Sequence, residues 1–125
     1  MLRSISARET LKNCNDRAYL VDIRDEYLTL YKKFDIHNII YLPFNELKNN
    51  IKALPKDKML ILADSAGIKS KEAVKILNNN GIKNTANLAG GMIDWERLGF
   101  PVKIDKKEML TGSCMCQLKK RNRKK

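Results

Sequence analysis

Residues 64–70 combine a carboxylate, a glycine, a lysine and two serines in one short segment that follows an apolar run. The segment consists of Asp64, Ser65, Ala66, Gly67, Ile68, Lys69 and Ser70. The apolar residues 59–63 predict a buried strand, and residues 71–79 have helical spacing. A tight loop between a strand and a helix turns backbone N–H groups and the helix dipole toward the loop. We therefore predict an anion cradle, with Asp64 where a nucleophile would be expected.

Two thiols lie one residue apart near the end of the chain, at Cys114 and Cys116. The cations of residues 119–125 favour their thiolate forms. Such a pair suits a sulfur-carrying or redox role, or a soft metal such as Cu(I) or Zn, which would then be shared between chains. The alternative is that the cysteines have no such role, and that Met115 and Leu118 dock on the domain. The spacing leaves these options open.

Other residues with reactive side chains have structural interpretations. We expect His37 to be a surface histidine and Cys14 to be an incidental thiol in a polar loop. Asp22 and Arg24 are expected to anchor a strand end by pairing with each other. Trp95 is expected in the core, between the last helix and the sheet.

Strands and helices must alternate to position these residues. A Ser6–Glu9 capping box predicts the first helix, Asn45 is a plausible N-cap for a later one, and Gly81 suits the C′ position after residue 79. The expected strands are 19–23, 38–42, 59–63 and 84–88. The expected helices are 7–12, 26–34, 45–51, the one that follows the loop, and 92–98.

This alternation predicts an α/β fold with a mainly parallel central sheet and helices on both faces. The chain has 125 residues, of which 43% are hydrophobic and 31% charged, as in soluble globular proteins. Three cysteines and the lack of a secretory or membrane-spanning segment favour a cytoplasmic protein. Periodicity ends after Val102, so we expect a domain at 1–102 and a flexible basic tail at 103–125.

Three motifs in this order resemble the rhodanese-like domain, over roughly residues 4–102. Residues 20–24 match its Asp-x-Arg signature, residues 36–43 are similar to its segment ending in Ile-Pro, and residues 88–95 with 99–101 match its last signature. The resemblance implies the rhodanese-like fold. It also implies a loop whose cysteine takes sulfur from a donor such as thiosulfate and passes the persulfide sulfur to an acceptor.

The resemblance places that cysteine at Asp64. It gives a loop of sulfurtransferase length, with Lys69 and Ser70 as the anion-binding residues. A carboxylate cannot carry a persulfide, but its oxygens can accept the amide bonds that an anionic substrate would take. We expect Asp64 to be a structural plug, with a cationic partner or a metal as the alternative ligand. The protein is then inactive or atypical at the usual loop, and we expect no cofactor and no metal site.

Two other functions stay open. The first is a sulfur carrier or sulfurtransferase that uses Cys114 or Cys116. The second is a non-enzymatic interaction module. The partners would be a sulfur donor or acceptor protein or a small thiol. The net charge of +11 comes mainly from the tail, which allows contact with a polyanion. The sequence does not give the oligomeric state.

Overall fold

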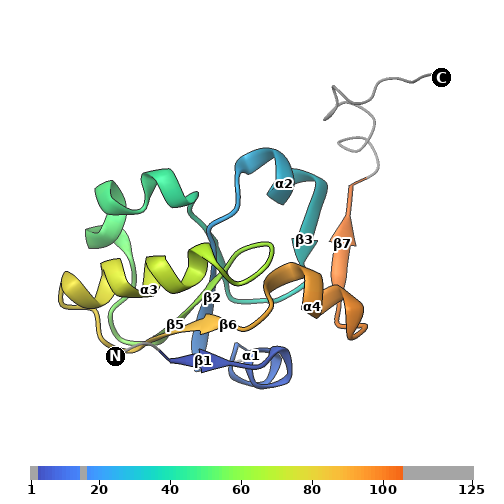
Figure 1. The fold of residues 1–125 in the computed structure, drawn as a ribbon, viewed down its shortest axis with the longest axis horizontal. Coiled ribbons are helices and arrows are strands. Elements are labelled where there is room, and N and C mark those ends of the chain that lie inside the picture. The colour runs from blue at the N-terminus through green and yellow to red at the C-terminus, as the bar shows by residue number, and fades with distance from the viewer. Residues whose placement is uncertain (1–2, 15–16, 106–125) are drawn as a thin grey trace.

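Five parallel strands form the central sheet of the computed structural model, which describes residues 3–14 and 17–105 (Figure 1). Their order across the sheet is β1-β6-β5-β2-β4. They are β1 (Ser4–Ile5), β2 (Ala18–Asp22), β4 (Ile39–Tyr41), β5 (Met59–Ala63) and β6 (Thr85–Leu88). A separate antiparallel ribbon joins β3 (Lys32–Phe34) to β7 (Val102–Ile104). The predicted α/β class with a mainly parallel sheet is confirmed.

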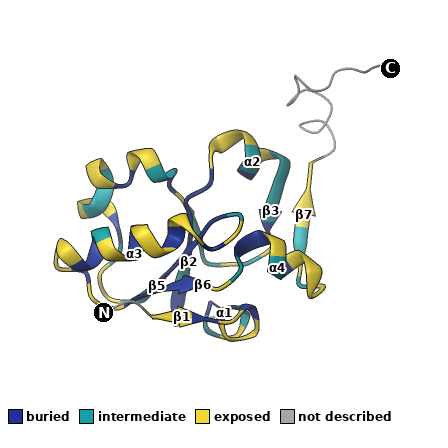
Figure 2. Cartoon of the chain, viewed as in Figure 1, coloured by how far each residue is buried: buried dark blue, intermediate teal, exposed yellow. Residues whose placement is uncertain are grey.

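Helices cover both faces of this sheet. They are α1 (Ala7–Asn13), α2 (Glu26–Tyr31), α3 (Lys69–Asn79), α4 (Gly91–Arg97) and the short 3₁₀ helices η1 (Phe44–Glu46) and η2 (Lys48–Ala53). Alternate residues of β5 enter opposite hydrophobic clusters, because successive strand side chains point to opposite faces. Ile61 packs with α1 and α4, whereas Leu60 and Leu62 pack with α3 and η2. Figure 2 shows the buried strands between these layers.

Local signals in the sequence located several elements well. The Ser6–Glu9 capping box is present, with the Glu9 amide donating to Ser6 Oγ at 3.1 Å. Strand β5 has the expected ends, and the other expected strands lie within one residue of their predictions. Gly81 follows α3 with a φ of +89°, as the C′ position requires.

Two predicted helices were wrong in extent or type. The helix expected at 26–34 ends at Tyr31, and residues 32–34 form β3. The Phe34 side chain fits helical spacing, but β3 pairs with β7, far along the chain, and this contact decides its conformation. Residues 45–51 lie in the two 3₁₀ helices, and Asn45 is not an N-cap. Neither 3₁₀ helix has a side-chain hydrogen bond at its N-terminus.

The structure adds three short strands that apolar periodicity did not predict: β1, β3 and β7. The expected domain boundary after Val102 falls inside β7, whose last residue is Ile104. Cys114, Cys116 and the rest of the tail from residue 106 lie outside the described residues, so the tail's separate character stays a prediction. No helix among the described residues is long and apolar enough to cross a membrane.

Trp95 is a core residue, as predicted. It is fully buried, packs edge-on against Phe34 and Phe100, and donates from Nε1 to the Pro101 carbonyl oxygen at 2.8 Å.

Cys14 was wrongly expected in a polar loop. Its side chain is fully buried in the cluster beneath α1, and burial raises the pKa of its thiol to about 12. Cys14 is therefore protonated at neutral pH and shielded from reagents.

Candidate functional site

The loop after β5 lies where parallel α/β sheets commonly bind ligands. From β2 the chain moves outward to the edge strand β4, whereas from β5 it moves to β6 on the other side. The carboxyl ends of β2 and β5 therefore flank the point at which the strand order reverses. A pocket of about 310 Å³ opens there, lined by residues 23–25 and Leu28 after β2 and by residues of the 64–69 loop.

The carboxylate of Asp64 fills the amide cradle of its own loop. Its side chain is buried, and the whole residue is 6% exposed. Oδ1 accepts from the Gly67 amide at 2.5 Å, and Oδ2 accepts from the amides of Lys69 at 2.7 Å and Ser70 at 3.3 Å. Helix α3 has no side-chain cap from its N-cap residue Ile68, so Asp64 satisfies its first amides instead. The predicted cradle exists, and this carboxylate is the anion within it.

The start of α4 holds the loop from its other side. The Met92 amide donates to the Asp64 carbonyl oxygen at 2.9 Å, and the Ile93 amide donates to that of Ser65 at 3.0 Å. Gly91 permits this close approach. It has a φ of +58°, and a Cβ there would lie 2.4 Å from the Asp64 carbonyl oxygen. Sequence reasoning missed this support, because it depends on a contact between two turns that lie more than twenty residues apart in the chain.

Replacing Gly91 by alanine is expected to destabilise the fold by about 3 kcal/mol, combining a left-handed φ with a backbone clash. Gly81→Ala is the matched control. Gly81 also has a positive φ, but its Cβ would meet nothing within 4 Å, so about 1 kcal/mol is expected. Chemical denaturation of both variants measures the difference. An equal loss of stability in the two variants would show that the close contact between Gly91 and the loop contributes nothing to the stability of the fold.

Asp22 and Arg24 form a buried ion pair at the end of β2, as predicted. Arg24 Nη2 lies 2.7 Å from Asp22 Oδ2, and the same nitrogen donates to the Lys32 carbonyl oxygen at 2.7 Å. The pair therefore ties the end of β2 to the start of β3. The Tyr41 pKa is raised, first by burial and then by the Asp22 charge, with Arg24 acting in the opposite direction.

The remaining predicted residues take different positions around the loop. Lys69 contributes its amide to Asp64, while its ammonium lies 5.8 Å from the centroid of the Phe44 ring. Ser70 is buried, and its hydroxyl has no hydrogen-bond partner among the described residues. Ser65, Ala66 and Ile68 line the pocket. His37 is exposed, as expected of a surface histidine.

The described residues contain no group of three or more His, Cys, Asp or Glu side chains that could hold a metal ion. Cys14 lies in the hydrophobic cluster on the α1 side of the sheet and does not line the pocket. The structure thus brings Asp64, Gly67, Lys69 and Ser70 together through the backbone and leaves no described thiol beside them.

Comparison with known proteins gives the family. The protein-family model described as Rhodanese-like domain matches residues 6–98 of the sequence. The chain belongs to the rhodanese-like domain family. A solved rhodanese-related protein from Thermoplasma volcanium superposes with a TM-score of 0.74 at 29% identity, over 82% of this chain and 99% of the other.

Curated relatives support the family at low identity. Rhodanese-like domain-containing protein 17 of Arabidopsis thaliana is 42% identical over 50 residues, which are 40% of this chain and 32% of that protein. The matched region is thus about a third of that protein's length. The thiosulfate sulfurtransferase GlpE of Haemophilus influenzae is 27% identical over 104 residues, which are 80% of this chain and 93% of GlpE.

Proposed function

We propose that this rhodanese-like domain performs no sulfur transfer at its central loop and acts as a binding module in sulfur metabolism. In this proposal Asp64 occupies the position of the family's catalytic cysteine. The observation that carries it is the set of three amide bonds to the Asp64 carboxylate. Those amides are the groups that would otherwise stabilise a thiolate or a bound anionic substrate.

The chemistry of the side chain supports loss of transfer. A persulfide forms when a thiolate attacks the outer sulfur atom of thiosulfate, whose own sulfur–sulfur bond breaks as sulfite leaves; the enzyme then holds the transferable sulfur atom on its cysteine sulfur. A carboxylate has no sulfur with which to hold it. An oxyanion such as thiosulfate would also have to displace the Asp64 carboxylate from the amides, because both anions accept hydrogen bonds from the same N–H groups. Both steps of the family's reaction are therefore blocked at this loop.

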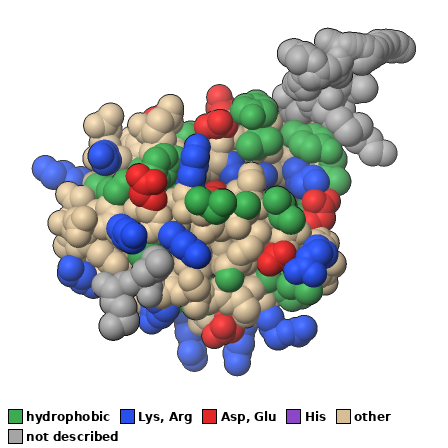
Figure 3. Space-filling view, viewed as in Figure 1, with side chains coloured by type: hydrophobic (Ala, Val, Ile, Leu, Met, Phe, Trp, Pro, Cys, Tyr) green, Lys and Arg blue, Asp and Glu red, His purple; other side chains and the backbone are tan. Residues whose placement is uncertain are grey.

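The pocket nevertheless keeps features that suit a partner. The apolar residues Ile23, Leu28 and Ile68 line it, together with Lys69. Ile68 is 75% exposed, and Ile93 on α4 is 59% exposed. Figure 3 shows hydrophobic side chains beside basic side chains near the middle of the visible face, where Figure 1 places the loop before α3. The partner we propose is a sulfur donor or acceptor protein, by association with the sulfurtransferase relatives.

A second candidate function uses the tail. Cys114 and Cys116 are the two thiols that remain once Cys14 is set aside as buried and protonated. Either could take up sulfur and pass it on, which would make the chain a sulfur carrier or sulfurtransferase with its reactive group outside the loop.

An assay of cyanide-dependent thiocyanate formation from thiosulfate tests both functions. The natural chain and the Cys114→Ser/Cys116→Ser variant are compared, and mass spectrometry locates any persulfide. The binding-module proposal expects no thiocyanate above background and no persulfide in either protein. Thiocyanate formed by the double variant would overturn the proposed inactivity of the loop. Activity and persulfide in the natural chain alone would establish the tail as the sulfur carrier.

A further inference from the structure

Positive charge is concentrated in one part of the domain. Residues 48–83 contain eight lysines and three acidic residues, one of which is the buried Asp64. The other described residues carry nine basic and nine acidic side chains and so have no net charge. The excess charge of the described domain therefore comes from η2, the turn before β5, the 64–70 loop, α3 and the turn after it.

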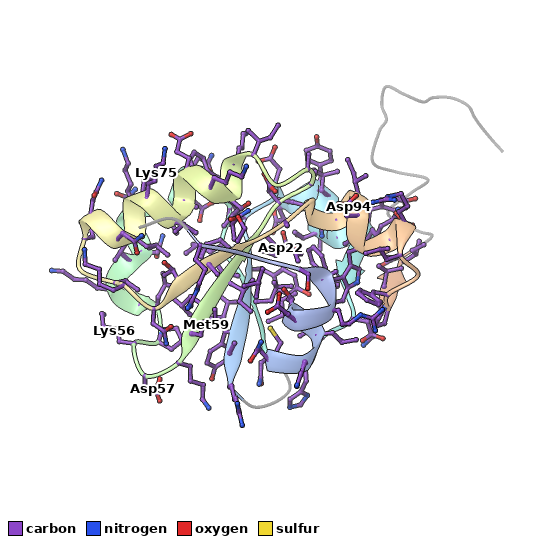
Figure 4. The ribbon with its side chains drawn as sticks, turned by 60° about the horizontal axis from the view of Figure 1, so that its bottom comes forward. Asp22, Lys56, Asp57, Met59, Lys75 and Asp94 are labelled. Atoms are coloured by element: carbon purple, nitrogen blue, oxygen red, sulfur yellow. The ribbon has the colours of Figure 1, made fainter. Side chains whose placement is uncertain are left out.

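Seven of these lysines are exposed, one of which is Lys69 in the 64–70 loop. We call the other six the lysine face: Lys48, Lys52, Lys56, Lys71, Lys75 and Lys83. They lie in or beside η2 and α3, which pack into the same hydrophobic cluster on one side of the sheet. Figure 4 shows Lys75 on α3 and Lys56, with Asp57 beside it, in the turn before β5. Asp57 and Glu72 are the exposed acids of this region.

The lysine face also differs from the rest of the domain in its ion pairing. Elsewhere, Lys32 pairs with Glu96 at 2.7 Å, Arg97 with Asp94 at 2.9 Å, and Lys103 with Asp35 at 3.6 Å. No lysine of the lysine face forms a salt bridge with a described residue; Lys83 and Lys56 donate instead to backbone carbonyl oxygens. Lys71 and Lys75, four residues apart on α3, repel each other. The face is thus a surface whose charge an anionic partner would neutralise.

The side chains of this face favour phosphate groups over an acidic protein. Protein interfaces have an apolar centre and are depleted in lysine. Among the exposed large hydrophobic side chains of the described residues, only Ile68 belongs to residues 48–83. Residues 48–83 also contain no aromatic side chain on which an unpaired base could stack, and no arginine for bidentate reading of a base edge. Lysines contact the nucleic-acid backbone as point charges.

We propose that the lysine face binds the phosphate backbone of a double-helical nucleic acid without reading its sequence. The basic tail at residues 103–125, most of which lies outside the described residues, carries the same sign of charge and would add contacts. The test must therefore separate the face from the tail, and it does so in the full chain by changing only residues of the described domain.

The test variant is Lys52→Gln/Lys71→Gln/Lys75→Gln. Its matched control is Arg8→Gln/Lys12→Gln/Arg97→Gln, which removes the same charge from α1 and α4 on the other side of the sheet. Fluorescence anisotropy measures binding to a mixed-sequence duplex, as DNA and as RNA, across about 50 to 200 mM salt. The test variant is expected to bind at least about tenfold more weakly, with a log–log salt slope shallower by about 2–3. The control should stay close to the natural chain.

Three results would overturn the proposal. The first is no duplex binding by the natural chain at the lowest salt concentration. The second is an equal loss in the test and control variants, because net charge alone would then explain it. The third is binding to polyglutamate as tight as to the duplex at equal charge, which would assign the face to acidic proteins. Unchanged thermal unfolding of both variants confirms that the fold is intact.

Discussion

The Asp64→Cys variant is expected to gain thiosulfate sulfurtransferase activity. The substitution puts a thiol where three amides converge, at the N-terminus of an eleven-residue helix. Those donors and the helix dipole lower the pKa of a thiol and stabilise its thiolate. The pocket beside the loop, about 310 Å³, leaves room for a small sulfur donor. Placing the nucleophile in an existing cradle supplies what the proposed function says is missing.

Asp64→Ser is the matched control, because serine is close to cysteine in size and accepts amide bonds without a thiol. Both variants are made with Cys114 and Cys116 replaced by serine, so that activity reports residue 64 alone. Thiocyanate formation by the cysteine variant should exceed that of the serine variant by at least about a hundredfold. Equal rates in a folded protein would mean that the cradle cannot support the chemistry, and that the loop's likeness to a sulfurtransferase loop is one of shape only.

Asp64→Ala is expected to cost about 4 kcal/mol of stability, since it leaves three buried or half-buried amides without their charged acceptor. For a domain of this size such a loss lowers the thermal midpoint by roughly 15 °C or more. Asp25→Ala is the control. Asp25 also lines the pocket and stands at the N-cap of α2, but its side chain makes no capping hydrogen bond. Its removal is expected to cost about 0.5 kcal/mol or less.

Added sulfate separates this explanation from a general packing defect. A cradle without its carboxylate should bind an external anion. Sulfate at about tenfold above its dissociation constant would then raise the free energy of unfolding of Asp64→Ala by roughly 1.4 kcal/mol. Sulfate also stabilises folded proteins generally, so its effect on Asp25→Ala is subtracted. Two results would contradict the role assigned to the Asp64 carboxylate. One is a loss of stability in Asp64→Ala no larger than that in Asp25→Ala, and the other is a sulfate effect that is the same in both variants.

The sequence predicted those elements whose cause is local. Residues 59–63 are apolar throughout and form the buried strand β5, and the Ser6–Glu9 capping box forms within one helical turn. Elements decided by distant partners were missed. Strand β3 exists because it pairs with β7, about seventy residues later. The pattern of apolar residues within 32–34 cannot predict a contact with so distant a segment. Cys14 has polar neighbours in the sequence, yet it packs beneath α1.

The candidate site divides in the same way. The interpretation of Asp64 as a carboxylate in an amide cradle needed only a strand, a short loop and a helix, all of which the sequence signals. The support from Met92 and Ile93 required knowing that the turn after β6 lies against the loop after β5. The position of the Lys69 ammonium near Phe44 likewise depends on the packing of η1 beside the loop. Neither contact can be predicted from the periodicity of apolar residues in the sequence.

The bonds from Met92 and Ile93 to the carbonyl oxygens of Asp64 and Ser65 involve only main-chain atoms. This support of the loop is therefore the same whatever side chain residue 64 carries. Under the proposal that Asp64 holds the position of the family's catalytic cysteine, selection on that position acts on two separate properties. One is the capacity to accept the amide hydrogen bonds, which maintains the fold, and the other is nucleophilicity, which catalysis requires. In evolutionary terms, a lineage could exchange catalysis for binding, or the reverse, through a change at this one residue without first remodelling the surrounding backbone.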